Sequence, residues 1–479
     1  MIKKELTPPV RIIACHGKIS DPTPLMTLST TNAYVGLPIK EPLKISGEGY
    51  IVLDFGRETR GGIRLVTGNS LNNGINSVPV RVRFGESVNE CMAELGEKNA
   101  VHAHSPRDIK TEYVSYSTAR IGETGFRFVR LDFTDGTDAE ILEILADGEI
   151  LDLPVKYEYK GDDPLLREIY DVAKRTIDLC AAGDYVWDGI KRDRLVWIGD
   201  MHPEMLALAT LYGRCDVFEN SMKFLMTVTP CDRWMCNIYT YSAWWIICLA
   251  DWYERTGARE FTEGCLDYAQ KIVEKFLEHI DEDGVLHITD RGLVDWPTVE
   301  KSDEQDGIRA ILLMMANRAV SLFEEFRVDK SNAVRLVSLL KKQPIKAREM
   351  MQVAGLKFMA TGKLDEDEVE LMKRLGANGM STFMSYYILK AYAYYYGSDE
   401  AIAVMKEYYN GMLSVGATSF WEDFHLDWLE NAGRIDELTP EGLDDLHGDR
   451  GAFCYVGFRH SLCHAWSTGI LAFMEEYGL

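Results

Sequence analysis

The sequence predicts a two-part chain in which an antiparallel β-sandwich is followed by a long helical domain. Short runs that alternate in polarity or are β-branched fill the first third, and apolar residues recur at helical spacing in the rest. Strands followed by an all-helical block indicate separate domains. We therefore expect an N-terminal β-sandwich domain at residues 1–160 and a helical domain at 161–479.

The strand runs of the first third are separated by glycine, asparagine and aspartate, as in antiparallel sandwiches. They are GYIVLDFG (49–56), GGIRLVTG (61–68), VPVRVRFGE (78–86), TEYVSYSTARIG (111–122) and GFRFVRLDF (125–133). We expect a short helix within 135–150 and a last strand at 154–163.

The helical pattern begins at Pro164, and Asp162 or Asp163 is expected to cap the first helix. About ten to twelve helices with short, glycine-bearing connections follow and indicate a run of helical hairpins. Six such hairpins would close into an (α/α)6 barrel, which fits the length of the segment. A helical solenoid is the alternative architecture.

The composition excludes several classes of function. The chain has 52 basic and 75 acidic residues and a net charge of −23, so nucleic-acid and membrane-surface roles are unfavourable. No window approaches the ~18 apolar residues of a membrane span. The opening MIKKELTPPVRII lacks the features of an export signal, and the ten cysteines are scattered, so we expect a cytoplasmic protein with reduced thiols.

The segment DYVWDGIKRDRLVWIGDMHPE (184–204) concentrates carboxylates and cations beside two tryptophans. Gly189 and Gly199 interrupt any helix, so we expect a loop between two helices. One interpretation is a surface ion-pair cluster that stabilises a long loop. The other is that several carboxylates and an arginine converge on a polyhydroxylated ligand, where neighbouring acids drive each other's pKa values apart.

Two later segments and the aromatic content bear on the same question. GATSFWEDFHLDW (416–428) carries Glu422, and HSLCHAWSTG (460–469) carries His464 beside Trp466. A histidine in such a run is either a core residue or a functional group. The 23 tyrosines and 10 tryptophans fill the core for the most part, but aromatic faces also line sugar-binding clefts.

Together these segments resemble the bacterial α-L-rhamnosidases of glycoside hydrolase family 78, with motifs in matching order along most of the chain. The resemblance implies that Asp193, which precedes Arg194-Leu195, is the general acid. It implies that Glu422, in GATSFWE, is the general base. It assigns sugar contacts to Asp188, Arg192, Asp200 and His464, with Trp197 and, from GLVDWP (292–297), Trp296 as aromatic walls.

The resemblance further implies an inverting exo-glycosidase that releases terminal α-L-rhamnosyl residues from a carbohydrate partner, without a cofactor or metal. The chain departs from the family loop at Gly189-Ile190-Lys191 and in having aspartate as the acid. These changes leave open another sugar, such as an unsaturated uronyl or other deoxyhexosyl residue. An anionic sugar would need an extra cation near Asp188, and Lys191 is the only indication of one.

A non-catalytic sugar-binding relative is a further alternative, but a binding protein needs neither of the two acids. The pair His102 and His104 lacks the pattern of a metal site, so we expect these residues to be solvated or to lie at the rim of the cleft. Homo-oligomerisation is left open.

Overall fold

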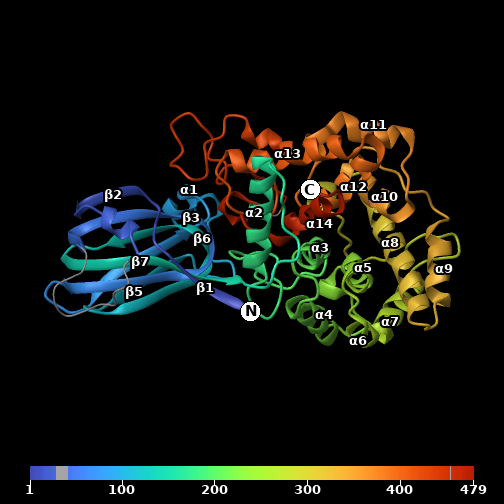
Figure 1. The fold of residues 1–479 in the computed structure, drawn as a ribbon, viewed down its shortest axis with the longest axis horizontal. Coiled ribbons are helices and arrows are strands. Elements are labelled where there is room, and N and C mark those ends of the chain that lie inside the picture. The colour runs from blue at the N-terminus through green and yellow to red at the C-terminus, as the bar shows by residue number, and fades with distance from the viewer. Residues whose placement is uncertain (29–40, 454) are drawn as a thin grey trace.

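Strands occupy the first third of the chain and helices most of the remainder (Figure 1). The computed structural model describes residues 1–28, 41–453 and 455–479. Its N-terminal sheet comprises β1 (Ile2–Thr7), β2 (Arg11–Ile19), β3 (Leu43–Asn72), β4 (Val78–Gly85), β5 (Asp108–Tyr113), β6 (Thr118–Phe133) and β7 (Thr137–Leu151).

The predicted antiparallel β-structure is confirmed, but in the described residues these strands form one curled sheet instead of two separate ones. The strand order is β1-β7-β3-β6-β4-β5, and β2 pairs with β3. The cause is the length of β3, because Leu43 and Thr67 both pair with Ile141 of β7. One bent strand therefore borders β7 on two sides, and the sheet closes around its own buried apolar cluster.

Two local predictions in this region were wrong. The short helix expected within 135–150 is the strand β7, which pairs with both β1 and β3, alternates in burial over residues 137–142 and is almost continuously buried after them. Pairing on two edges outweighs the local preference of the segment. No strand is assigned at 154–163, where the backbone instead crosses to the helices.

The helices after this crossing agree with the predicted hairpin pattern. Asp163 caps the first of them, since its Oδ1 accepts hydrogen bonds from Leu165 N–H and Leu166 N–H. The helices are α2 (Pro164–Cys180), α3 (Met201–Tyr212), α4 (Asp216–Val228), α5 (Tyr239–Thr256), α6 (Arg259–Glu263), α7 (Leu266–Leu277), α8 (Glu304–Glu325), α9 (Ser331–Leu340), α10 (Met351–Thr361), α11 (Glu366–Leu375), α12 (Ser385–Tyr396), α13 (Ser398–Ser414) and α14 (Ile470–Glu476).

Alternate helices contact one another in a closed cycle. α3 contacts α5, and the series continues through α8, α10, α12 and α14, which returns to α3. The remaining long helices, such as α7, α9 and α13, pack against members of this cycle. One continuous apolar core runs through the helices and is separate from that of the sheet.

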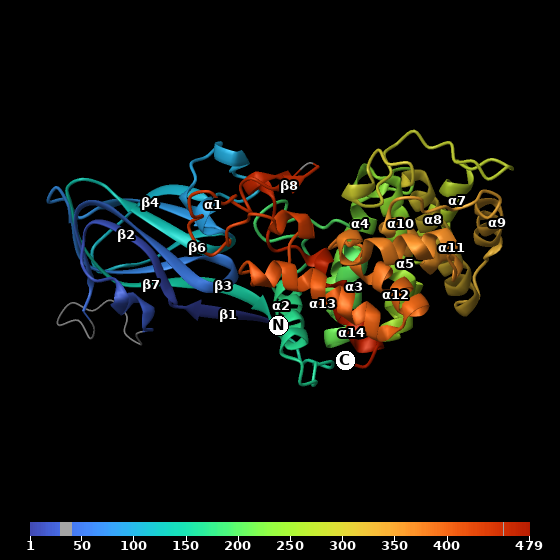
Figure 2. The same ribbon diagram turned by 90° about the horizontal axis from the view of Figure 1, so that it is seen from above.

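Late parts of the chain return to the β-region. Figure 2 shows the segment that carries the short strand β8 (Gly451–Ala452) beside α1 (Val88–Met92) and β6. Hydrogen bonds join Ser87 to His447 and Asn89 to Thr439. The β-region therefore contacts loops of the helical region directly.

The predictions about membrane spans and cysteines can be compared with the described residues. None of the described helices is both long and apolar enough to cross a bilayer. The nine cysteines in the described part of the chain are unpaired, in agreement with reduced thiols. The remaining cysteine, Cys454, lies outside the described residues.

Candidate active site

Residues 184–200 form the predicted inter-helix loop between α2 and α3, and the last four residues of the 184–204 segment begin α3. Asp188 closes the loop, because its N–H donates to the Leu195 carbonyl over 3.1 Å and its Oδ1 accepts from Leu195 N–H over 2.9 Å. Asp193 and Arg194 have φ values of 55° and 54°. For a residue other than glycine, the left-handed backbone conformation raises the free energy by ~1–3 kcal/mol. It persists only where the surrounding structure enforces it, which is often at active sites.

Glu422 lies in the loop after α13 and is held by backbone of the 460–464 segment. Its N–H donates to the Ser461 carbonyl over 3.0 Å, and its Oε2 accepts from Ser461 N–H over 3.4 Å. The indole N–H of Trp466 donates to the Glu422 carbonyl over 2.8 Å. The carboxylate is therefore fixed from both its backbone and its side chain, and it is 2 % exposed.

Arg192 joins the two predicted acids. Its Nη1 lies 3.0 Å from Asp193 Oδ2, and its Nη2 lies 2.6 and 2.5 Å from the two oxygens of Glu422. Its Nε donates to the carbonyl of Arg459. One buried guanidinium thus contacts both carboxylates, although Arg192 lies 230 positions before Glu422, and the expected meeting of Asp193 and Glu422 is observed.

His464 faces three carboxylates, those of Glu422 and two further residues. Its Nε2 lies 3.9 Å from Asp188, 3.8 Å from Asp200 and 3.7 Å from Glu422. Burial raises the pKa of each of these carboxyls, although Arg192 opposes the rise at Glu422. Burial also lowers the pKa of His464 well below its ordinary value. The cluster therefore carries less charge than its formal count of acids.

The stability of the protein is expected to depend on this proton uptake. A carboxyl whose pKa is raised in the folded state keeps its proton above the unfolded-state pKa of ~3.9, so folding becomes less favourable as the pH rises above that value. Asp200→Asn removes this penalty and retains an acceptor for Tyr241. We expect its Tm to exceed that of the wild type by about 1–2 °C at pH 8 and by less at pH 4.

Thermal unfolding at the two pH values measures this difference, with Asp184→Asn as the control because Asp184 is exposed in the same loop. Parallel Tm values for wild type and Asp200→Asn across the pH range would contradict the interpretation.

These residues converge on a cavity of about 120 Å³. All the predicted site residues line it except Arg192, whose guanidinium contacts Asp193, Glu422 and the Arg459 carbonyl. The lining is Asp188, Asp193, Trp197, Asp200, Ile238, Tyr241, Arg291, Leu293, Trp296, Glu422, His464 and Trp466. The tryptophans and carboxylates give the cavity aromatic walls and several hydrogen-bond acceptors.

Sequence reasoning missed three polar or aromatic members of this lining. Tyr241 lies in the first turn of α5 and donates its hydroxyl to Asp200 over 3.3 Å. Arg291 immediately precedes the GLVDWP motif, and its guanidinium lies 5.0 Å from the centre of the Trp296 ring. Trp466 was noted beside His464, but nothing in the sequence indicated that it would hold Glu422.

The two histidines expected to be solvated or at the rim differ in role. His104 is exposed, and its Nδ1 lies 3.7 Å from Asp193 Oδ1, which places it at the rim of the cavity. His102 accepts a hydrogen bond from Arg107 N–H and supports its own loop.

A larger cavity of about 660 Å³ lies beside Trp234 and Lys275. It contains several charges of both signs but none of the converging acids described above. Its lining includes Asn237 and Asp290, which directly precede Ile238 and Arg291 of the smaller cavity. We therefore assign the candidate active site to the smaller cavity. The larger cavity is lined in part by residues adjacent in sequence to those of the smaller one.

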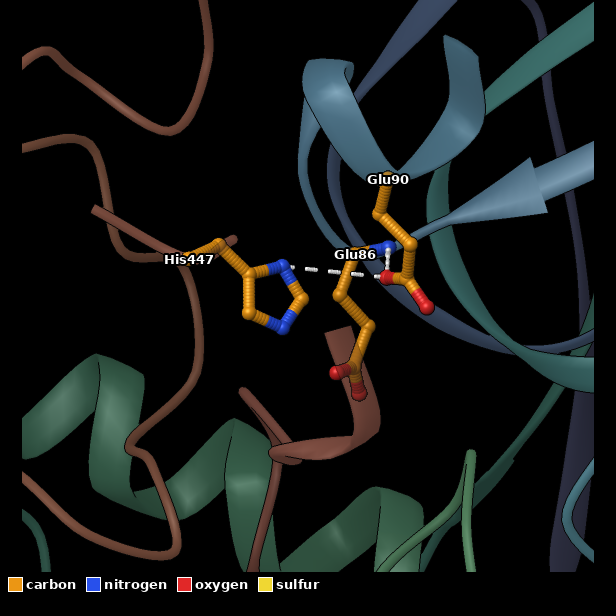
Figure 3. Close-up of side chains that lie close together, drawn as sticks. All are labelled: Glu86, Glu90 and His447. Atoms are coloured by element: carbon orange, nitrogen blue, oxygen red, sulfur yellow. Dashed lines mark hydrogen bonds and ion pairs between the residues drawn. The ribbon is translucent and has the colours of Figure 1, made fainter. Parts of the chain in front are cut away.

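One buried trio among the described residues has atoms spaced closely enough to bind a metal: Glu86, Glu90 and His447 (Figure 3). The Nζ of Lys191 lies 2.9 Å from Glu86 and 3.2 Å from Glu90. The ammonium supplies a positive charge at this place, so the trio does not require a cation. These contacts also show that the Lys191 side chain points away from the cavity. It therefore does not supply the cation that an anionic sugar would need there.

Comparison with known proteins confirms the resemblance inferred from the sequence. Residues 157–326 match the family model for the bacterial alpha-L-rhamnosidase 6 hairpin glycosidase domain. No curated protein sequence matches the chain. The family match supports a glycoside hydrolase.

Solved rhamnosidase structures share the fold. The rhamnosidase of Klebsiella oxytoca with rhamnose bound is 19% identical with a TM-score of 0.78, and the match covers 100% of this chain and 96% of that one. The family 78 rhamnosidase of Bacillus sp. GL1 is 16% identical with a TM-score of 0.73, covering 96% and 49%. That of Streptomyces avermitilis, complexed with L-rhamnose, is 16% identical with a TM-score of 0.65, covering 89% and 42%. The chain thus spans about half of the two longer proteins.

Proposed function

We propose that this protein is an inverting exo-glycosidase that hydrolyses terminal α-L-rhamnosyl residues, with Asp193 as general acid and Glu422 as general base. The observation that carries the proposal is the meeting of these two carboxylates on opposite nitrogens of Arg192, at the wall of a cavity lined by tryptophans. Inverting glycosidases need two carboxyls ~6.5–9.5 Å apart, with room for a water molecule.

In the proposed reaction, Asp193 donates a proton to the glycosidic oxygen as the bond to the anomeric carbon breaks. Glu422 removes a proton from a water molecule that attacks the opposite face of the sugar through an oxocarbenium-like transition state. Glu422 must be ionised, and Arg192 favours that form by opposing the effect of burial. We propose this role for Arg192 in place of the sugar contact that the resemblance implied, because Arg192 is not among the residues that line the cavity.

The remaining residues of the cavity suit a neutral, polyhydroxylated ring. Asp188, Asp200 and His464 offer hydrogen-bonding atoms to hydroxyl groups, and each such bond contributes ~0.5–1.5 kcal/mol. Trp197 and Trp296 present apolar surfaces for the C–H groups and the C6 methyl of a deoxyhexose. The volume of about 120 Å³ is too small for several sugar residues, which supports cleavage at a chain end.

Arg291 favours one second candidate, a glycosidase for a sugar that bears a carboxylate, such as an unsaturated uronyl residue. It lines the cavity and supplies the cation that Lys191 does not. The acids of the same cavity oppose an anionic ligand by like-charge repulsion, so the neutral deoxyhexose remains our first assignment.

The wider expectations from the sequence stand as proposals. The closed cycle from α3 to α14 supports an (α/α)6 barrel rather than an open solenoid, with the division into domains 1–160 and 161–479. The cytoplasmic location and any homo-oligomer remain predictions.

A panel of nitrophenyl glycosides tests the proposal, and the α-L-rhamnoside is expected to be turned over fastest. Proton NMR should show β-L-rhamnose as the first product, and azide should not rescue a Glu422 variant through a covalent intermediate. Preference for an unsaturated uronide would favour the second candidate. Binding of rhamnose without any turnover would favour a non-catalytic relative, and net retention would exclude the inverting mechanism.

A further inference from the structure

We infer that Lys191 is a positioning residue through which the N-terminal β-region fixes the geometry of both proposed acids. This inference rests on the roles proposed for Asp193 and Glu422. It concerns the link between the curled sheet and the catalytic loop, which neither the cavity lining nor the family comparison assigns.

Lys191 is 6 % exposed, and its side chain runs from the catalytic loop into the β-region. Besides its contacts with Glu86 and Glu90, its Nζ donates to the carbonyls of Phe458 and His460 over 3.0 and 2.6 Å. The two carboxylates come from the turn after β4 and from α1. Every partner of the ammonium therefore belongs to a segment distant in sequence from Lys191.

Glu86 connects the same ammonium to the segment that holds Glu422. Its Oε2 accepts from Leu462 N–H over 2.6 Å, and its Oε1 lies 3.5 Å from the Ser461 hydroxyl. Ser461 in turn exchanges backbone contacts with Glu422. One carboxylate of the β-region thus contacts both the residue before Arg192-Asp193 and the segment that supports the base.

The backbone at Lys191 is held by the β-region as well. Ser105 donates its hydroxyl to the Lys191 carbonyl over 2.8 Å. A Cβ added at Gly125 of β6 would lie 2.8 Å from Lys191 N and 2.9 Å from the Ile190 carbonyl carbon. Since real Cβ atoms do not approach backbone so closely, this glycine is required for the sheet to pack against the loop.

These contacts determine the position of the catalytic loop. Asp193 has a left-handed backbone conformation that surrounding contacts must enforce, and Lys191 lies two residues before it. Loss of the ammonium removes the contacts that hold the loop to the 458–462 segment. A shift of about 1 Å in catalytic groups can lower the rate by ~10²-fold.

The test uses Lys191→Met and the double variant Lys191→Met/Glu86→Gln. The double variant neutralises Glu86, while Glu90 keeps the guanidinium of Arg107 at 3.7 Å, so it is the one expected to fold well. Lys357 provides the matched control because it is also 6 % exposed and binds Asp365 and Glu368 over 3.0 and 2.6 Å. The control variants are Lys357→Met and Lys357→Met/Glu368→Gln.

For the double variant at Lys191, kcat on the rhamnoside is expected to fall by ~10²-fold while KM changes by less than about threefold. Hydrogen–deuterium exchange should quicken in peptides covering 186–196 and 458–464. The Lys357 variants should lose thermal stability with neither effect. The split between kcat and KM separates positioning from a general loss of folded protein.

Unchanged kcat per folded molecule, unchanged exchange in either peptide, or the same losses in the Lys357 variants would each overturn the inference. If the wild type turns over none of the glycosides, the proposed function is contradicted independently of the inference about Lys191. Exchange in the two peptides then decides alone whether Lys191 holds the loop.

Discussion

Glu422→Gln is expected to lower kcat on the α-L-rhamnoside by ~10³–10⁴-fold while leaving sugar binding largely intact. A glutamine amide has nearly the shape of the carboxylate and can still accept a hydrogen bond from Arg192. It cannot take a proton from the attacking water, so the loss falls on the chemical step. Because the group acts only in the transition state, kcat and kcat/KM should fall together.

The measurement is steady-state kinetics combined with the rise in Tm that rhamnose causes, since a ligand that binds only the folded state stabilises it. Asp423→Asn is the matched control. Asp423 is the next residue in the chain and is also buried, and burial raises its pKa to about 7. However, it does not line the cavity, so kcat should stay within about threefold. A comparable loss in both variants would show that disturbance of the segment, not removal of a base, is responsible.

The residues of this site could be found from the sequence because each lies in a short motif with an unusual composition. Asp188, Asp193 and Asp200 share one loop, and Glu422 follows a tryptophan in another. The contacts between these residues could not be predicted from the sequence. That Arg192 would bind both acids depends on a meeting of segments 230 positions apart, which no local pattern encodes.

Lys191 illustrates the same limit. In sequence it is a cation beside Asp188 and was considered for an anionic substrate. In the structure it faces Glu86 and Glu90, and the cation at the cavity is Arg291. Which way a loop side chain points is decided by the elements that pack on either side, here a turn and a helix of the β-region.

The fold shows where local patterns suffice. Helical periodicity and the aspartate before Pro164 identified the helical region and the start of its first helix, because a helix bonds within its own segment. The strand β7 was mistaken for a helix, because what stabilises it is pairing with β1 and β3. The single curled sheet has the same origin, since it follows from the bends of β3 and not from the composition of any strand.

Asp193→Asn is expected to produce a loss that depends on the leaving group. Asparagine cannot donate a proton in place of the carboxylic acid, so rhamnosides of poor leaving groups such as simple alcohols should lose ~10³–10⁴-fold in kcat/KM. A dinitrophenyl rhamnoside departs as a stable anion and needs little protonation. Its loss should therefore be about tenfold or less, and the difference between the two substrates isolates the acid from any effect on binding.

The position of Asp193 makes this comparison necessary. Its carboxylate contacts Arg192, which also holds Glu422, so neutralising it alters the surroundings of the base as well as removing the acid. A disturbed base would slow both rhamnosides equally, because attack by water is common to them. Asp184→Asn, an exposed change in the same loop, should leave both substrates unaffected. An equal loss for good and poor leaving groups in Asp193→Asn would remove Asp193 from the acid role and assign it to the support of Arg192.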